Sequence, residues 1–403
     1  MTKLIAGLDI GNGYVKGKVQ SETVTNIDIA SGVAYVTSTH DIKTPDSDIP
    51  EFMGEIFDRM DVSFESPLVP DKNRRLFGKR GLQSGMSVEE FDVYSHISKA
   101  KQPLSAILTL GCLAAKTLAD YYAKNKALPD TVLKATVRVS LALPISEYKK
   151  YRREYADGYK ASSHIVEFHN FEQPVRVELS FEDVQVIAEG ASAYYAIKDK
   201  GEELMDAMLA DIRKMGEPLP GITAKDILSA KNTVGIDIGE GTTNFPVFQN
   251  GKFNPDASVT FDKGYGAVLN AALERLQDLG YPFNSRKELQ EFLNTTPTTL
   301  NKRRYDKIAD IVIEEIVSFA SEVGMQFSKV MARVGSYVEV VFVYGGGASP
   351  VKKELYPILL DKAKSFGGGE VTYPILYLDS RYSRFLNREG LYSMSEKLAG
   401  TKN

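Results

Sequence analysis

The sequence predicts an α/β protein built from two related domains. A loop of the form Asp-Ile-Gly-x-Gly occurs twice, at residues 9–13 and 237–241, each directly after an apolar run. Segments typical of strands and helices alternate along the chain, which is the pattern of sheets covered by helices. A chain of 403 residues is longer than one hydrophobic core usually fills, so two or more domains are expected.

The individual elements follow from apolar periodicity. Short apolar runs bounded by polar residues, glycine or proline predict strands, and apolar residues that recur every three to four positions predict helices. Strands are expected at residues 4–10, 15–19, 136–143, 175–180, 233–238 and 338–343. Helices are expected at residues 104–125, 146–155, 181–198, 265–279 and 305–334, the last of them ending just before Gly335.

Two segments are less regular. Residues 37–102 contain several prolines and short apolar clusters, which predict an inserted subdomain with its own loops. Residues 201–231 carry a helical patch at 203–215, which the Pro-Leu-Pro-Gly run at 218–221 should stop. The expected division is therefore a first domain at 1–184 with the insertion, a second at 185–380, and a C-terminal helix at 381–403 that returns to the first.

Composition limits the classes of function. The formal charge is −4 and the pI is near 5.8, so direct binding to nucleic acid is not expected. The single cysteine, Cys112, lies in an apolar stretch and is expected to be a buried thiol. The four histidines show no spacing typical of a metal site. The first strand begins almost at the N-terminus and no long apolar run is evident, so a cytoplasmic protein without a membrane segment is expected.

The paired loops have the residue types that phosphate binding requires. Glycines can adopt positive φ without a steric cost, and their N–H groups can approach phosphate oxygens closely. Asp9 and Asp237 would then face the cation that accompanies the phosphates. Either loop alone is equally typical of a tight hairpin turn. The repetition, together with a third glycine loop at residues 343–348, favours nucleotide binding.

These motifs resemble those of the superfamily of actin, heat-shock chaperones and sugar kinases, and within it the ParM group of bacterial actin-like proteins. Residues 9–16 and 237–244 resemble its two phosphate motifs, and residues 344–348 its adenosine motif. Residues 186–191 resemble the first connecting helix between the domains, and residues 387–392 the second connection and final helix. The resemblance implies an actin-like fold, in which two related α/β domains flank a central nucleotide cleft.

The resemblance also implies roles for single residues. ATP, possibly GTP, is the expected nucleotide, with Mg²⁺ held through water by Asp9 and Asp237. Glu189, on the connecting helix, would position the hydrolytic water with Asp237, although an ordinary helix-surface carboxylate is the alternative. The expected phosphate contacts are Gly11, Asn12, Gly13, Lys16, Gly239, Glu240, Gly241, Thr242 and Thr243. The expected adenosine contacts are Gly345, Gly346 and Gly347.

Three positions depart from the family pattern. Asn12 stands where a hydroxyl residue is common, and Asn244 where an aspartate is common. Pro246 cannot donate a hydrogen bond within a sheet, which predicts an irregular or edge strand there. The backbone cradle for phosphate does not depend on any of the three.

The function implied by the resemblance is that of an ATP-dependent polymerising protein. Its filaments would be homopolymers that segregate plasmid DNA through a DNA-bound adaptor protein. One alternative is an actin-like filament with another cargo, in a phage or in cell shape. The other is a small-molecule kinase of the same superfamily, although the sequence shows no motif for the carboxylate base that such a kinase needs.

Overall fold

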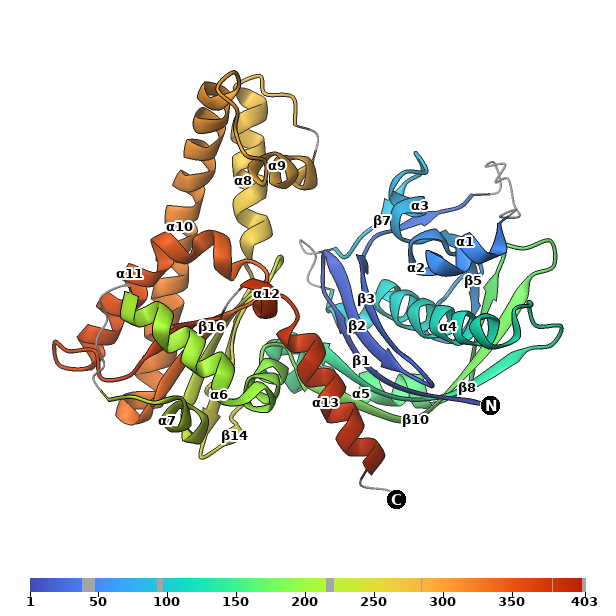
Figure 1. Cartoon of the computed structure of the whole chain (residues 1–403), viewed down its shortest axis with the longest axis horizontal. Coiled ribbons are helices and arrows are strands. Elements are labelled where there is room, and N and C mark those ends of the chain that lie inside the picture. Colours follow the sequence, from blue (N-terminus) through green and yellow to red (C-terminus); the bar gives the residue numbers. More distant parts are fainter. Residues whose placement is uncertain (38–47, 93–96, 215–220, 284, 379, 401–403) are drawn as a thin grey trace. The chain divides into compact units, whose positions relative to one another are not determined.

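The computed structural model describes residues 1–37, 48–92, 97–214, 221–283, 285–378 and 380–400. The chain divides into two compact units (Figure 1). Unit 1 comprises Met1–Ala196 and Asn387–Asn403, and unit 2 comprises Ile197–Leu386. Each unit contains one mixed sheet with helices packed on it, so the predicted α/β class is confirmed.

Five strands form the part of the unit 1 sheet that carries the first loop. Their order is β3-β2-β1-β8-β10, with β1 antiparallel to β2 and parallel to β8, which in turn is parallel to β10. The apolar run of β1 is buried almost throughout, as expected for a central strand with both faces covered. The bounds are β1 Thr2–Ile10, β2 Tyr14–Gln20, β3 Val24–Ala30, β8 Leu133–Leu143 and β10 Val175–Ala188.

Unit 2 repeats this plan around β11. One neighbour of β11 is antiparallel and divided into β12 and β13 by Pro246, which confirms the predicted irregular strand. The other neighbour, β16, is parallel, and β17 extends the sheet beyond it. Strands β14 and β15 pair with β13 and β12 in the place that β3 takes in unit 1. The bounds are β11 Thr233–Ile238, β12 Thr243–Phe245, β13 Val247–Gln249, β14 Lys252–Phe253, β15 Val259–Phe261, β16 Val340–Tyr344 and β17 Ile375–Tyr377.

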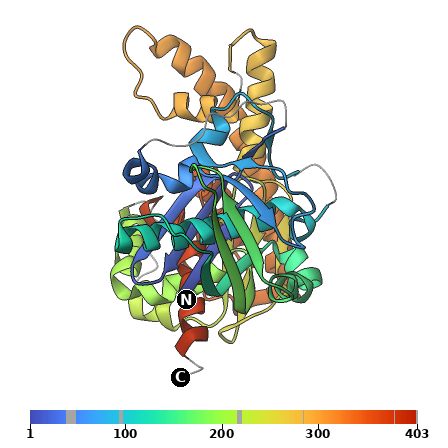
Figure 2. The ribbon, with the colours of Figure 1, turned by 90° about the vertical axis from the view of Figure 1, so that its right-hand side faces the viewer.

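The unit 1 sheet continues past β10 through five further strands. The first, β9, lies antiparallel to β10, and both are green in Figure 2. Three of the five, β5, β6 and β7, come from the region of the expected insertion, of which residues 38–47 and 93–96 lie outside the described part. Side chains from this region, including Phe52, Phe64 and Phe77, belong to the same hydrophobic core as β1. The bounds are β9 His164–Phe168, β5 Asp61–Glu65, β6 Arg75–Leu76, β4 Val33–Tyr35 and β7 Val88–Glu89, with short helices α1 Ile49–Gly54, α2 Ile56–Arg59, α3 Gly78–Leu82 and η1 Lys99–Lys101.

Helices cover both sheets, and four of the five predicted helices are found close to their predicted spans. In unit 1, α4 (Pro103–Asn125) packs on β1, β8 and β10 and buries Cys112, and α5 (Ile145–Lys160) packs on β10. By length and composition α4 is apolar enough to cross a membrane, but most of it is buried in the core of unit 1. In unit 2, α10 (Lys302–Val334) packs against α8 (Tyr265–Asp278) and α11 (Ala348–Phe366), and α9 (Arg286–Leu293) packs against α8.

The helix expected at residues 181–198 is partly wrong. Strand β10 continues to Ala188, paired with β8 as far as Leu143, and α6 (Ala191–Lys214) begins only after a turn. A register shift between Phe181 and Asp183 interrupts the strand alternation, and the apolar residues beyond it then resemble a helical pattern. The helical patch at 203–215 belongs to α6 up to Lys214, while Met215 and residues 218–220 lie outside the described part.

The chain ends on unit 1. After α7 (Ala224–Ser229) and α12 (Ser380–Ser383) in unit 2, the last helix, α13 (Leu386–Gly400), returns to β1. The Ser395 hydroxyl donates a hydrogen bond to the Ala6 carbonyl at 2.6 Å. A Cβ added to Gly7 would lie 2.2 Å from the backbone nitrogen of Tyr392, so α13 is packed as closely on β1 as glycine permits.

Candidate nucleotide-binding site

The first loop connects β1 to β2. Asp9 is the penultimate residue of β1 and lies opposite Lys16 of β2 in the ladder. The Gly11 N–H donates to the Tyr14 carbonyl at 3.0 Å, which closes the turn. Ser31, which directly follows β3, supports the turn, because its hydroxyl donates to the Gly11 carbonyl at 2.5 Å. The loop is therefore held rigidly by its own strands.

The loop glycines serve a different purpose from the one expected. Positive φ is not found at Gly11, Gly13, Gly239 or Gly241. The constraint at Gly11 is space instead, since a Cβ there would lie 2.8 Å from the Tyr14 carbonyl oxygen. The hairpin can be closed this tightly only because a side chain is absent.

A buried cluster of charges lies at the end of β1. Asp9, Lys99 and Glu189 are all buried residues, each less than a tenth exposed. The Lys99 ammonium donates to Glu189 Oε1 at 2.8 Å. Burial raises the pKa of the Asp9 carboxyl; Lys16 opposes this rise, Glu189 adds to it, and Lys99 opposes it. Two acidic and two basic groups thus act on one another within unit 1.

Glu189 does not lie on a helix, which corrects the expected placement. It occupies the turn between β10 and α6, and its N–H donates to the Leu143 carbonyl at 2.8 Å. The alternative of an exposed helix-surface carboxylate is therefore wrong as well. The strand end brings Glu189 to the same edge of the sheet as Asp9, because β1, β8 and β10 are parallel and all end there.

Lys99 is a charged residue of this cluster that the sequence reasoning missed. It lies in η1, within the region expected to be an inserted subdomain with its own loops. Burial lowers the pKa of the Lys99 ammonium. The carboxylates of Glu189 and Asp9 together raise it by more, so the pKa lies above its ordinary value. No local pattern could have identified it, because its partners are distant in sequence.

The second loop connects β11 to β12 and rests on the start of α8. Asp237 is 5% exposed, and in the strand register it lies opposite Asn244 of β12 and Tyr344 of β16. The Gly239 N–H donates to the Thr242 carbonyl at 2.9 Å, as the Gly11 N–H does in the first loop. The Gly239 and Glu240 carbonyls accept hydrogen bonds from the first N–H groups of α8 at 2.9 and 2.8 Å. The two loops therefore share their hydrogen-bond pattern.

The side chains of the second loop differ in their surroundings. The Thr243 hydroxyl donates to the Lys263 carbonyl at 2.8 Å and is buried, so it contributes to the packing of unit 2. Thr242 accepts a hydrogen bond from the Asn244 amide at 3.3 Å. Glu240 is partly exposed, and its carboxylate lies 3.5 Å from Arg286 of α9. Thr242 and the backbone of the loop remain the stronger candidates for phosphate contact.

The third glycine loop is adjacent to Asp237. Gly345 follows β16 with a φ of 98°, and a Cβ there would lie 2.5 Å from Asp237 Oδ1. The Gly347 N–H donates to the Ile238 carbonyl at 2.9 Å. A Cβ on Gly346, by contrast, would meet no heavy atom within 4 Å. Unit 2 thus brings Asp237, the second phosphate loop and the third glycine loop to one edge of its sheet.

The donor set fits a hydrated magnesium ion better than a directly chelated metal. Within the described ranges, no three His, Cys, Asp or Glu side chains are grouped as metal ligands. Asp9 and Asp237 each present a buried carboxylate at a strand end, beside a loop rich in backbone N–H groups. Mg²⁺ prefers oxygen ligands and commonly keeps several waters, so one carboxylate from a loop is a suitable ligand.

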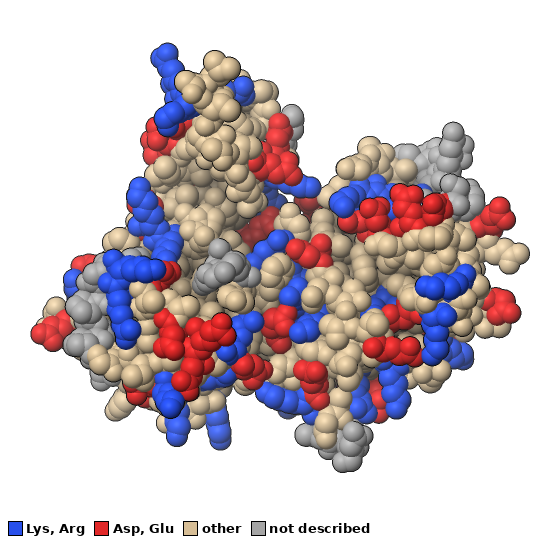
Figure 3. Space-filling view, viewed as in Figure 1, with Lys and Arg blue, Asp and Glu red and all other residues tan. Residues whose placement is uncertain are grey.

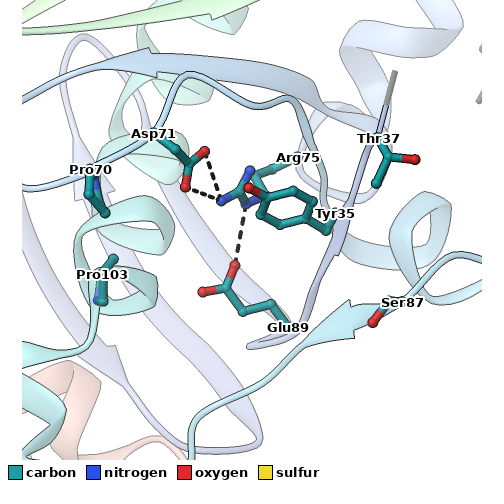
Figure 4. A pocket seen from close by; sticks show the side chains of 8 residues that line it. All are labelled: Tyr35, Thr37, Pro70, Asp71, Arg75, Ser87, Glu89 and Pro103. Carbon is teal, nitrogen blue, oxygen red and sulfur yellow. Dashed lines mark hydrogen bonds and ion pairs between the residues drawn. The ribbon is translucent and has the colours of Figure 1, made fainter. Parts of the chain in front are cut away.

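A separate cavity of about 470 Å³ in unit 1 is lined by side chains that form ion pairs with one another (Figure 4). The buried Arg75 guanidinium lies 3.0 Å from Asp71 and 3.3 Å from Glu89, and stacks 3.8 Å from the centre of the Tyr35 ring. The charge of Arg75 is thus balanced within the chain. We assign this cluster a role in stabilising the edge of the sheet formed by β6, β4 and β7.

Two protein-family models match the chain, one in its N-terminal half and one in its C-terminal half. Residues 7–191 match the model of the N-terminal domain of actin-like proteins. Residues 235–356 match the model of the C-terminal domain of MreB-like archaeal actin homologues. A search of curated proteins found no match to the sequence.

Solved structures resemble the chain over its full length. The actin-like protein Alp7A is 16% identical with a TM-score of 0.63, and the match covers 99% of this chain and 97% of that one. ParM of Bacillus thuringiensis with ATP is 15% identical with a TM-score of 0.59 and full coverage of both chains. The archaeal actin homologue Ta0583 is 11% identical with a TM-score of 0.60, covering 99% of this chain and 100% of that one. The predicted actin-like fold is thereby confirmed, with domain models of actin-like proteins matching residues 7–191 and 235–356 and ParM, Alp7A and Ta0583 sharing the fold.

Proposed function

We propose that this chain is an ATP-hydrolysing protein that polymerises, and that its filaments segregate plasmid DNA through a DNA-bound adaptor. The observation that carries the proposal is the pair of rigid loops, one in each unit, each with a buried aspartate at the preceding strand end. Structures of a ParM relative with ATP, AMPPNP and ADP support a nucleotide as the ligand. ATP is preferred over GTP on the same ground.

In this proposal the backbone N–H groups of both loops bind the β and γ phosphates, and Lys16 adds a positive charge. Asp9 and Asp237 hold Mg²⁺ through water. The bound ion would neutralise negative charge on the phosphates in the transition state. The third glycine loop supports the adenosine, since the open space above Gly346 permits close approach of a ligand to the backbone.

Glu189 is proposed to position the water that attacks the γ phosphate. A buried carboxylate fixed at a strand end can accept a hydrogen bond from that water and take up its proton. Asp237 would assist by orienting the same water. The roles of both residues follow from the family resemblance and are supported by their burial at the sheet edges that carry the loops.

Filament formation is the second part of the proposal. A nucleotide that binds one conformation of the chain better than another shifts the chain toward that conformation, and hydrolysis reverses the shift. A contact between unlike faces of identical subunits repeats into a helical filament. Slow hydrolysis would then act as a timer for filament disassembly.

An indirect link to DNA agrees with the charge distribution. On the face shown in Figure 3, Lys and Arg are interspersed with Asp and Glu. DNA binding generally requires a coherent basic surface, and the net charge of this chain is −4. We therefore propose a DNA-bound adaptor as the partner, with the filament in the cytoplasm.

The primary test combines light scattering with phosphate release. The purified chain is mixed with Mg²⁺ and ATP, with ADP and nucleotide-free samples as controls. We expect scattering that rises with ATP and decays as phosphate accumulates. Phosphate release without any polymer, across a range of salt and protein concentrations, would instead favour a soluble kinase of the same superfamily.

The catalytic assignment is tested by Glu189→Ala. Removal of a group that positions the attacking water typically costs a factor of about 10² or more in turnover. We expect the variant to bind nucleotide and polymerise while phosphate release slows by roughly that factor. Glu182→Ala is the matched control, because Glu182 is an exposed residue of the same strand that pairs with Arg138. Unchanged turnover in Glu189→Ala would remove Glu189 from the mechanism.

A further inference from the structure

Lys99 combines features that packing alone does not explain. It is 6% exposed, and its ammonium donates to Glu189 at 2.8 Å. Burying an ion pair costs desolvation energy that the attraction between the charges often fails to recover. A buried ion pair is therefore weak evidence for a stabilising role, since apolar residues in place of both partners are often at least as stable. A lysine in this place points to a role beyond stability.

The position of Lys99 is fixed by a second carboxylate on another element. Glu147 of α5 accepts hydrogen bonds from the Ser98 hydroxyl at 2.6 Å, the Lys99 N–H at 3.0 Å and the Ala100 N–H at 3.1 Å. These three contacts hold η1 against α5. The Lys99 ammonium also lies 5.6 Å from the centre of the Phe91 ring. The backbone of Lys99 is thus anchored independently of its contact with Glu189.

The opposing charges explain what the ammonium does. The Glu189 carboxylate raises the pKa of the Asp9 carboxyl, and the Lys99 ammonium opposes this effect. The same ammonium binds one oxygen of Glu189 directly, at 2.8 Å. The carboxylate then has one orientation, as a group that positions water requires.

We propose that Lys99 is a positioning residue for ATP hydrolysis, which holds the Glu189 carboxylate in the correct orientation through the anchor that Glu147 provides. This proposal rests on the proposed ATPase function. It assigns to the Lys99 ammonium an effect on the chemical step and none on the affinity for nucleotide. The effect is transmitted through Glu189, since Lys99 is not proposed to touch the phosphates.

The test is a double-mutant cycle between Lys99→Met and Glu189→Gln, with steady-state phosphate release as the readout. Lys99→Met keeps the length of the side chain and removes its charge. We expect kcat to fall at least about tenfold with KM for ATP changed by less than about threefold. The double variant should be no slower than Glu189→Gln alone, because both substitutions remove the same function.

Two further variants separate positioning from structure. Lys99→Arg retains the charge and should recover part of the lost kcat. Lys101→Met is the matched control, because Lys101 lies in the same turn but is exposed and faces the Tyr151 ring at 4.7 Å; its kcat should equal that of the wild type. Should Lys99→Met fail to fold, Glu147→Gln carries the same test through loss of the anchor, with kcat again falling and KM unchanged.

The outcomes are distinct. Wild-type kcat in folded Lys99→Met, or losses that multiply in the double variant, would overturn the role of Lys99 and leave the ATPase proposal intact. A wild-type chain that releases no phosphate under any condition tested would overturn the proposed function itself, and the role of Lys99 with it. Reduced kcat that Lys99→Arg does not improve at all would contradict a role that depends on charge.

Discussion

The burial of the Asp9 carboxyl opposes the stability of the folded chain. Its pKa is raised in the folded chain, mainly by burial, relative to a usual value of 3.8. Between that value and the raised pKa, the folded state binds more protons than the unfolded state, so the free energy of unfolding falls as pH rises. Above the raised pKa the full cost of a buried charge remains. Asp9 is thus retained at a cost, as functional residues often are.

Asp9→Asn should accordingly stabilise the folded chain near pH 7 while it impairs Mg²⁺-dependent turnover. The gain should disappear near pH 3, where the carboxyl is protonated in both states. Thermal unfolding at the two pH values, without nucleotide, measures the effect. A variant that is less stable than the wild type at pH 7 would show that attraction from Lys16 and Lys99 outweighs burial.

Gly345 and Gly346 offer a pair of substitutions with opposite expectations. Gly345→Ala forces a side chain into a left-handed backbone conformation and against Asp237, so a loss of about 2 kcal/mol or more is expected in the free energy of unfolding. Gly346→Ala meets open space and should leave that free energy within about 0.5 kcal/mol. If the loop supports a nucleotide, Gly346→Ala should nevertheless lose much of the thermal stabilisation that ATP provides. Full ATP stabilisation of this variant would exclude close contact at Gly346.

At the scale of elements, the sequence predicts regular structure well and long-range placement poorly. The cores of β1, β11 and α10 follow from local apolar patterns, and their predicted spans agree closely with the structure. The boundary between β10 and α6 was misplaced because a register shift altered the local pattern near Phe181. The contact between Lys99 and Glu189 could not be predicted from the sequence, because the two residues are far apart in the chain and only the tertiary fold brings them together.

The contact of α13 with β1 yields a prediction at the same scale. Gly7→Ala would place a methyl group against the backbone of Tyr392, so α13 must shift away from β1. We expect a loss of about 1–3 kcal/mol in the free energy of unfolding, as is usual for overpacked sites. Gly54→Ala, in α1 of the same unit, is the control because a Cβ there meets nothing within 4 Å. Equal stability of the two variants in urea unfolding would show that α13 adapts without cost.

On the scale of the whole molecule, the duplicated plan is the dominant feature. Both units place a parallel strand and an antiparallel hairpin on opposite sides of the strand that carries the aspartate. The shared plan explains why the Asp-Ile-Gly-x-Gly pattern was visible in the sequence twice. Most added structure lies in different places, with extra strands beyond β10 in unit 1 and long helices in unit 2.

The duplication predicts how substitutions in the two units should combine. If both aspartates serve one nucleotide and its cation, Asp9→Ala and Asp237→Ala each disable the same catalytic unit, and their effects on turnover should not multiply. We expect either variant to lose at least about tenfold in kcat/KM for Mg²⁺-ATP. The double variant should have about the same kcat/KM as the less active of the two single variants. Two loops that act on separate ligands would instead give losses that multiply, because groups without a shared partner contribute independently. Phosphate release by the four proteins, at saturating Mg²⁺ and varied ATP, therefore decides whether the repeated loop builds one site or two.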